Sequence, residues 1–246
     1  MVEKYGQSNE KHSLTTKKYF PSKGEKMPGP LKALPIANRW QDMAEAFAEH
    51  ISLEMIARAK RIYEPMLVPG LLQTAAYTRS LALGNDLDLS SDFEDGEPDL
   101  ESAADLRRDR QRRLTSSNPL RLHAIMDENV VRRQVGGPAV MAEQLRHMVS
   151  MSALAHIVLQ IIPISHGAYT GMESAGFSVL EFEPGTREQD FACFYEGAIG
   201  AVWAECEEDR DRTLQQLDCL EKLALSPENS RKFMASIAQE MAVLQS

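Results

Sequence analysis

Apolar and polar positions repeat with two different periods along the chain, and each period predicts a type of element. Apolar residues spaced three and four apart predict helices over 38–60, 99–115, 138–152, 207–225 and 227–243. Short apolar runs bounded by turn residues predict strands over 121–126, 156–162, 177–182, 190–195 and 198–205. Asp127 and Ser226 are expected to cap the helices that follow them, and Gly136-Gly137 is expected to end the first of these helices. We therefore expect an α+β fold with a helical N-terminal part, a mixed β-sheet with a helical crossover and a short meander, and C-terminal helices.

A proline-bounded segment follows the first predicted helix. Pro65 and Pro69 fix their own backbone angles and push their neighbours towards extended geometry, so 63–69 should cross the domain as ordered, non-helical chain. Gly70 then gives the backbone conformational freedom, and the apolar residues after it return to helical spacing. The rest of the predicted domain is organised around this segment.

Polar side chains embedded in apolar sequence are the candidate functional residues. Glu64, Gln73 and Tyr77 lie in or just after the proline-bounded segment, and a glutamate in apolar surroundings needs a cationic partner. Arg107 and Arg110 are three apart on one predicted helix and are the best inward-facing pair for such a carboxylate. The arginines of this helix form either an anion-binding wall or a solvated face from which one or two turn inward to pair Glu64, Glu128 or Glu196.

The same three glutamates have two interpretations. If two of them converge in an apolar cleft that raises one pKa, they can carry general acid–base chemistry. The alternative is that each is a structural ion pair. His166 precedes Gly167 and Tyr169 in a segment that is either a closing loop or plain surface. The methionines predict an adaptable apolar interior, and they include Met66, Met141, Met148, Met151 and Met172. Such an interior either binds a hydrophobic ligand or uses methionine simply to fill gaps in the core.

Composition narrows the function classes. A chain of 246 residues with 43% apolar content can bury one good-sized core, and a net charge of −9 argues against nucleic acid as the main partner of this chain alone. We find no apolar run near the roughly 20 residues that span a bilayer and no secretory signal. Cys193, Cys206 and Cys219 match neither a disulfide framework nor a metal site, and Cys193 is expected in the core. We expect a cytoplasmic protein without a metal or other cofactor.

Several segments together carry a resemblance to a known family. They are 63–77, Arg107-Arg108-Asp109-Arg110-Gln111, Asp127-Glu128, Arg132 to Pro138, Tyr195-Glu196 and Ala224 to Glu228. In order and approximate spacing, from about Trp40 to the C-terminus, the chain resembles the C-terminal effector domain, of unknown function, of actinobacterial XRE (Cro/CI-like) regulators. The resemblance implies an N-terminal helix-turn-helix domain, but the polar residues 1–37 are too few to hold one and are expected to form a flexible tail. Residues 38–246 are then a single effector-like domain.

Two functions of different classes follow from this pattern. The first is a regulator-like protein that binds a hydrophobic small molecule or a protein partner without reading DNA. The second is a pathway enzyme of specialised metabolism, cyclase-like, in which an apolar pocket holds a reactive conformer by shape. Homodimer formation is compatible with both. The expected ligand-binding residues are Glu64, Gln73, Tyr77, Arg107, Arg110, Glu128, Tyr195 and Glu196; no catalytic residue is assigned.

Overall fold

The computed structural model describes residues 45–84, 100–197, 200–204 and 206–244. Within these ranges, only the backbone is described for residues 45–48, 83–84, 100–107, 196–197 and 200–202. The expected flexible tail over 1–37 lies outside the described residues.

The helices and strands follow one another in a mixed order. The helices are α1 (Glu45–Ile56), α2 (Ala75–Gly84), α3 (Leu100–Thr115), α4 (Glu128–Arg132), α5 (Gly137–Met151), α6 (Glu207–Leu223) and α7 (Pro227–Val243), with short 3-10 turns η3 (Gly70–Leu72) and η5 (Ile164–His166). The strands are β1 (Ala59–Glu64), β2 (Arg121–Asp127), β3 (Ile157–Ile162), β4 (Phe177–Glu181), β5 (Phe191–Gly197) and β6 (Gly200–Ala204).

All six described strands form one mixed sheet in the order β3-β2-β1-β4-β5-β6. Strands β1, β2 and β3 are parallel, whereas β4, β5 and β6 form an antiparallel meander that joins the sheet at β1. The α+β class, the parallel crossover and the meander predicted from the sequence are confirmed.

The first predicted helix is wrong at its C-terminal end. It was expected to reach residue 60, but α1 ends at Ile56 and Ala59–Glu64 is the central strand β1. The strand was missed because Lys60 and Arg61 interrupt its apolar pattern. Lys60 is nevertheless buried, beside a carboxylate of α1, and Arg61 pairs with Asp218 and Glu221 of α6.

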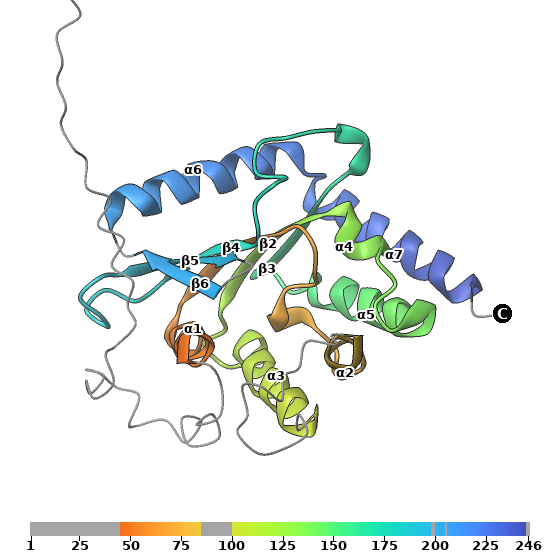
Figure 1. The fold of residues 1–246 in the computed structure, drawn as a ribbon, viewed down its shortest axis with the longest axis horizontal. Helices are drawn as coiled ribbons and strands as arrows, with labels where there is room; N and C mark the ends of the chain where they lie inside the picture. The colour runs from red at the N-terminus through yellow and green to blue at the C-terminus, as the bar shows by residue number, and fades with distance from the viewer. Residues whose placement is uncertain (1–44, 85–99, 198–199, 205, 245–246) are drawn as a thin grey trace, which may run out of the picture.

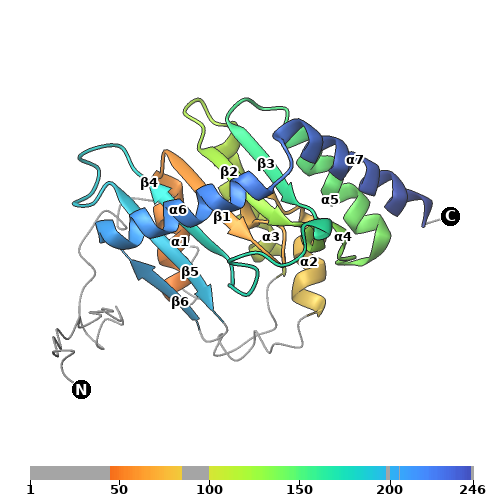
Figure 2. The ribbon, with the colours of Figure 1, turned by 90° about the horizontal axis from the view of Figure 1, so that it is seen from above.

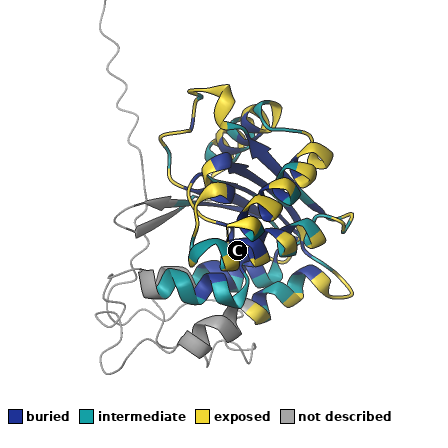
Figure 3. Ribbon diagram, turned by 90° about the vertical axis from the view of Figure 1, so that its right-hand side faces the viewer, coloured by how far each residue is buried: buried dark blue, intermediate teal, exposed yellow. Residues whose placement is uncertain are grey.

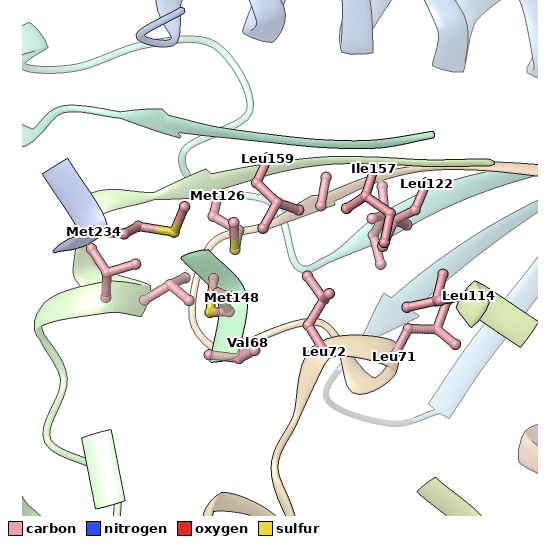
Figure 4. Packing of buried hydrophobic residues seen from close by; sticks show 14 of the residues in the cluster. Val68, Leu71, Leu72, Leu114, Leu122, Met126, Met148, Ile157, Leu159 and Met234 are labelled. Carbon is pink, nitrogen blue, oxygen red and sulfur yellow. The ribbon is translucent and has the colours of Figure 1, made fainter. Parts of the chain in front are cut away.

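The sheet separates two apolar clusters. Helix α6 covers one face, while α1, α2, α3 and α5 lie on the other, and α7 packs against α5 beside β3 (Figures 1 and 2). The larger cluster lies on the four-helix side and includes Leu72, Leu122, Met126, Met148 and Leu159 (Figure 4). The strands are buried while the outer surfaces of the helices are exposed (Figure 3).

Two helix starts match their predicted caps, and one helix end does not. Asp127 caps α4 and Ser226 caps α7 through their side-chain oxygens, as expected. Helix α4, however, ends at Arg132 rather than at the glycines that follow. Gly136 instead adopts a left-handed conformation (φ 71°) at the start of α5, where its Cα lies too close to Ser80 of α2 for a side chain.

Candidate functional site at the carboxyl edge of the parallel strands

The carboxyl ends of β1, β2 and β3 meet at one edge of the sheet because these strands are parallel. Open sheets of this kind bind ligands most often at that edge. The proline-bounded segment leaves it after Glu64, α4 begins there after Asp127, and the loop of residues 163–176 crosses it from β3 to β4. We call this region the carboxyl edge.

A chain of three side chains fastens the crossing loop to the edge. Tyr169 of the loop donates its hydroxyl to Oδ2 of Asp127 at 2.6 Å, and Tyr63 of β1 donates to the Tyr169 oxygen at 2.8 Å. The second oxygen of Asp127 accepts the backbone N–H of Asn129 at 2.8 Å. Both carboxylate oxygens are therefore engaged.

The two phenols of this chain are held in their neutral form. Burial and the hydrogen bond donated to Asp127 raise the pKa of Tyr169. Burial, and next the negative charge of Asp127, raise the pKa of Tyr63. The phenols can donate hydrogen bonds but are poor bases or nucleophiles at ordinary pH.

Glu128 has a second anchoring role at the same edge. Its carboxylate accepts the guanidinium N–H of Arg132 one turn later in α4, and its other oxygen accepts the backbone N–H of Ile164 at 2.8 Å. It is a buried carboxylate that joins α4 to the start of the crossing loop. The structural ion-pair interpretation of Glu128 is the one that this geometry supports.

Glu64 ends β1 on the side of the sheet opposite to Tyr63, and it is half-buried. Its carboxylate lies against Gly176 at the end of the crossing loop, where a Cβ atom would come within 2.8 Å of Oε2. A side chain at position 176 would require the Glu64 carboxylate to shift. The segment before β4 and the end of β1 are thus in close contact.

Exposed apolar side chains occur on both segments that leave the carboxyl edge. Met66 and Leu67 follow β1, whereas Ile164 and Met172 lie in the crossing loop, and their exposed fractions range from 38% to 61%. They are four of the six large apolar residues exposed in the described part of the chain. Met141 and Met148 are buried as expected, but the prediction of an interior position is wrong for Met66 and Met172.

Gln73 and Tyr77 act inside the proline-bounded segment. Gln73 donates its side-chain N–H to the carbonyl of Val68 at 2.7 Å, and the Tyr77 hydroxyl accepts the Val68 N–H at 3.2 Å. Both side chains are buried. They hold the segment that carries Met66 and Leu67, and so position the carboxyl edge rather than face a ligand.

Of the two arginines expected to face inward, the structure describes the side chain of Arg110 alone. Arg110 is buried as expected, but its partner is Glu54 of α1, at 2.7 Å from Nε to Oε1, rather than any of the three glutamates expected from the sequence. The helix carries Arg110 to the side of α1, away from the carboxyl edge. The side chains of Arg107 and Glu196 lie outside the described part of the structure.

Tyr195 belongs to a row of aromatic rings on the α6 side of the sheet. It pairs in register with Phe177, which pairs with Tyr63, and the ring centroids are 6.5 Å and 5.5 Å apart. The Tyr195 hydroxyl donates to Thr213 of α6, which itself donates to the carbonyl of Asp209. This row leads into the carboxyl edge at Tyr63.

Sequence reasoning missed Tyr63, Asp127 and Tyr169 as one unit. Tyr169 was noted within a loop, and Asp127 only as a helix cap. The available signal was the position of Tyr63 and Asp127 at the ends of two parallel strands. It was lost because the expected helix ran to residue 60 and 63–69 was expected only as non-helical chain, so that no strand was predicted there.

None of the described helices is long and apolar enough to cross a bilayer. Among the described residues, no group of three or more histidine, cysteine, aspartate or glutamate side chains is arranged to hold a metal ion.

The fold is an α+β domain with exposed apolar side chains on the segments that leave the ends of its parallel strands. Residues 47–236 match the family model described as "Domain of unknown function (DUF5753)", and the chain belongs to this family. Comparison with the curated proteins and with the solved structures found no match.

Proposed function

We propose that this domain is a non-enzymatic, regulator-like binding protein, and that the carboxyl edge is its binding surface for a hydrophobic ligand. The observation that carries the proposal is the exposure of Met66, Leu67, Ile164 and Met172 on the two segments that leave the carboxyl ends of β1 and β3. Exposed apolar residues that gather in one region mark interaction surfaces more often than scattered ones do. Methionine suits such a surface because its side chain adapts to different shapes.

The polar groups of the edge favour binding over chemistry. The carboxylate oxygens of Asp127 and Glu128 accept hydrogen bonds that anchor the crossing loop and α4. Both phenols have raised pKa values. A framework of this kind keeps a surface in one shape, and preorganisation strengthens binding because less is lost on ordering.

The resemblance to effector domains of XRE regulators supports the regulator-like class. A domain of the effector type is expected to work by binding, in the cytoplasm, a small molecule or the apolar segment of a protein partner. The net charge of −9 agrees with a chain that does not itself bind DNA.

The experiment uses Nile red, a neutral apolar dye whose fluorescence rises on binding. Met66→Ser and Met172→Ser each remove about 1 kcal/mol of apolar contact, so the double variant should bind the dye about tenfold or more weakly. Val243→Ser is the matched control, since Val243 is 71% exposed but lies at the end of α7. Equal binding by the double variant and the wild type would refute the assignment of this surface.

The cyclase-like enzyme remains a second candidate because of the chain Tyr63–Tyr169–Asp127. The Tyr63 hydroxyl can turn its hydrogen from the Tyr169 oxygen to a carbonyl oxygen that gains charge in a transition state. Native mass spectrometry of freshly purified protein, followed by extraction, separates the two functions. A co-purified compound that stays unchanged on incubation supports binding, whereas its conversion to a product supports the enzyme.

A further inference from the structure

The two edges of the sheet differ in how their backbone is covered. At the β3 edge, Ile161 donates its N–H to Oγ of Ser230 at 3.0 Å and accepts the N–H of Leu225 at 2.8 Å, and α7 packs alongside (Figure 2). At the opposite edge, β6 is the last strand of the described sheet and pairs with β5 alone. An edge strand turns alternate N–H and C=O groups outward, so β6 offers a template for one more strand.

The N-terminal part of the chain joins the described domain beside β6. Residues 1–44 end at Glu45, the first residue of α1. One turn further on, the ring of His50 packs on Phe194 of β5 and Trp203 of β6, with centroids 4.3 Å and 5.7 Å apart. Five residues of helix span about 8 Å, so the junction lies within about 15 Å of β6. The part of the chain before α1 therefore starts next to the open edge.

One stretch of this N-terminal part has the composition of a strand. Residues 14–20 read Leu-Thr-Thr-Lys-Lys-Tyr-Phe, in which β-branched and aromatic residues dominate, and Pro21 follows as a stop. We call residues 14–20 the strand segment. Residues 21–44 connect it to α1, and 24 residues of coil span about 25–30 Å, which exceeds the distance to β6. A connection of that length holds the strand segment near β6 at a concentration of about 1 mM, and a flexible tail can become ordered on a surface that it binds.

Net charge favours contact between the strand segment and the rest of the chain. The first 40 residues hold eight lysine or arginine residues and three glutamates, so their net charge is +5. The whole chain carries −9, and the residues after position 40 therefore carry −14. Opposite charges attract over about 8–10 Å at ordinary ionic strength. The lysines of the strand segment are thus drawn to the acidic domain.

An acidic turn lies directly after β6. Helix α6 begins three residues beyond the strand, and Glu207 and Glu208 are exposed on its first turn. Glu208 pairs with Arg212 at 3.3 Å, whereas Glu207 forms no ion pair within the described part of the chain. Successive residues of a strand point to opposite faces of a sheet. In a strand laid on β6, either Lys17 or Lys18 therefore faces α6 and this acidic turn.

We propose that the strand segment of the same chain adds to the outer side of β6 and closes the open edge of the sheet. Backbone hydrogen bonds to β6 supply the contact, as in other cases of strand addition, and a lysine beside α6 adds the charge attraction. A closed edge cannot pair with a second copy of the chain or with another extended peptide. The strand segment therefore controls whether the domain associates through β6, a surface separate from the carboxyl edge.

The test places a nitroxide spin label on Cys206 of the full-length chain. Cys206 is exposed two residues after β6, Cys193 is buried, and Cys219→Ser removes the other exposed thiol. We expect the label to broaden the amide NMR signals of the strand segment. Thr16→Pro removes one backbone N–H and cannot continue a ladder, so it should restore those signals. Ser8→Pro, the same change outside the strand segment, is the matched control and should leave them broadened.

Hydrogen exchange of β6 gives a second readout without a label. The amides of residues 200–204 that point outward should exchange about tenfold faster in Thr16→Pro than in the wild type, because several backbone hydrogen bonds are lost together. The double variant Lys17→Glu/Lys18→Glu should also speed this exchange, and more so at low salt. Lys4→Glu/Lys11→Glu makes the same change of charge outside the strand segment and should have the smaller effect.

The source of the added strand is checked with mixed samples. Spin-labelled chain without isotope is mixed with unlabelled chain that carries nitrogen-15, so only contacts between two copies broaden signals. We expect sharp signals in this mixture. Broadening in the mixture would show that a second copy supplies the strand and would overturn the proposal. Sharp signals of the strand segment in the labelled wild type, or equal exchange of β6 in the wild type and Thr16→Pro, would overturn it as well.

Discussion

Removal of the Arg110 guanidinium is the sharpest test of how this fold is held together. Arg110→Met keeps most of the side-chain volume but leaves Glu54 without the two hydrogen bonds that it accepts at 2.7 Å and 3.1 Å. Breaking one side of a buried ion pair costs about 3–5 kcal/mol because a charge stays buried. Lys60 still pairs with Glu54, so we expect the lower end, about 3 kcal/mol.

Urea unfolding monitored by circular dichroism measures this loss. Arg112→Met is the matched control two residues later, since Arg112 is 79% exposed and pairs with Asp109 on the surface. A surface pair of this kind contributes about 0–1 kcal/mol. Equal losses for the two variants would refute the claim that Arg110 balances a buried charge.

Arg110→Met should also change how the stability of the fold depends on pH. Because the folded pKa of Glu54 is depressed, its stabilising effect is complete above the unfolded value of about 4.3 and is lost as the pH falls through the folded pKa. Arg110 is the largest cause that lowers this pKa, so its removal shifts acid unfolding to higher pH. An unchanged acid midpoint in Arg110→Met would contradict this electrostatic account.

Three further predictions concern separate parts of the molecule. Tyr169→Phe removes the hydroxyl that fastens the crossing loop; it should cost about 1–2 kcal/mol in urea unfolding and speed hydrogen exchange over 163–176, and unchanged exchange would argue against the anchor. Gly136→Ala should destabilise by more than about 2 kcal/mol, because φ is 71° and the new Cβ would lie 2.2 Å from Ser80 Oγ. Gly185→Ala, with φ 82° and open space around it, is its control, and the two variants should not lose the same stability. The pKa of His50 is about 4 in the folded state and about 6.5 unfolded, so stability should fall by up to about 3 kcal/mol as the pH drops from 6.5 to 4. His50→Phe should flatten that slope in urea titrations, and a slope like that of the wild type would disprove the assignment.

Local sequence rules predicted the elements whose causes are local. Asp127 and Ser226 were recognised as caps because a cap is a hydrogen bond to a backbone N–H two or three residues away. The meander was recognised because short apolar runs between turn residues leave few alternatives. Strand β1 was missed because Lys60 reads as a solvated residue, and nothing local shows that Glu54 comes to lie beside it.

The candidate site shows the same division. The expectation that an inward-facing arginine pairs with a buried carboxylate was correct, because an unpaired buried charge costs too much free energy. The identity of that carboxylate, Glu54, depended on how α3 packs against α1. Tyr63, Asp127 and Tyr169 are separated by more than a hundred residues at the extremes, and their meeting is a consequence of strand order.

The chain by itself determined its α+β class, most element boundaries and the family resemblance, because periodicity, caps and proline act over a few residues. Only the tertiary structure decided which strands are parallel neighbours, which polar groups share a buried space and which methionines face outward. The physical reason is that burial and charge pairing depend on contacts between segments far apart in sequence. Those contacts exist only once the sheet has formed.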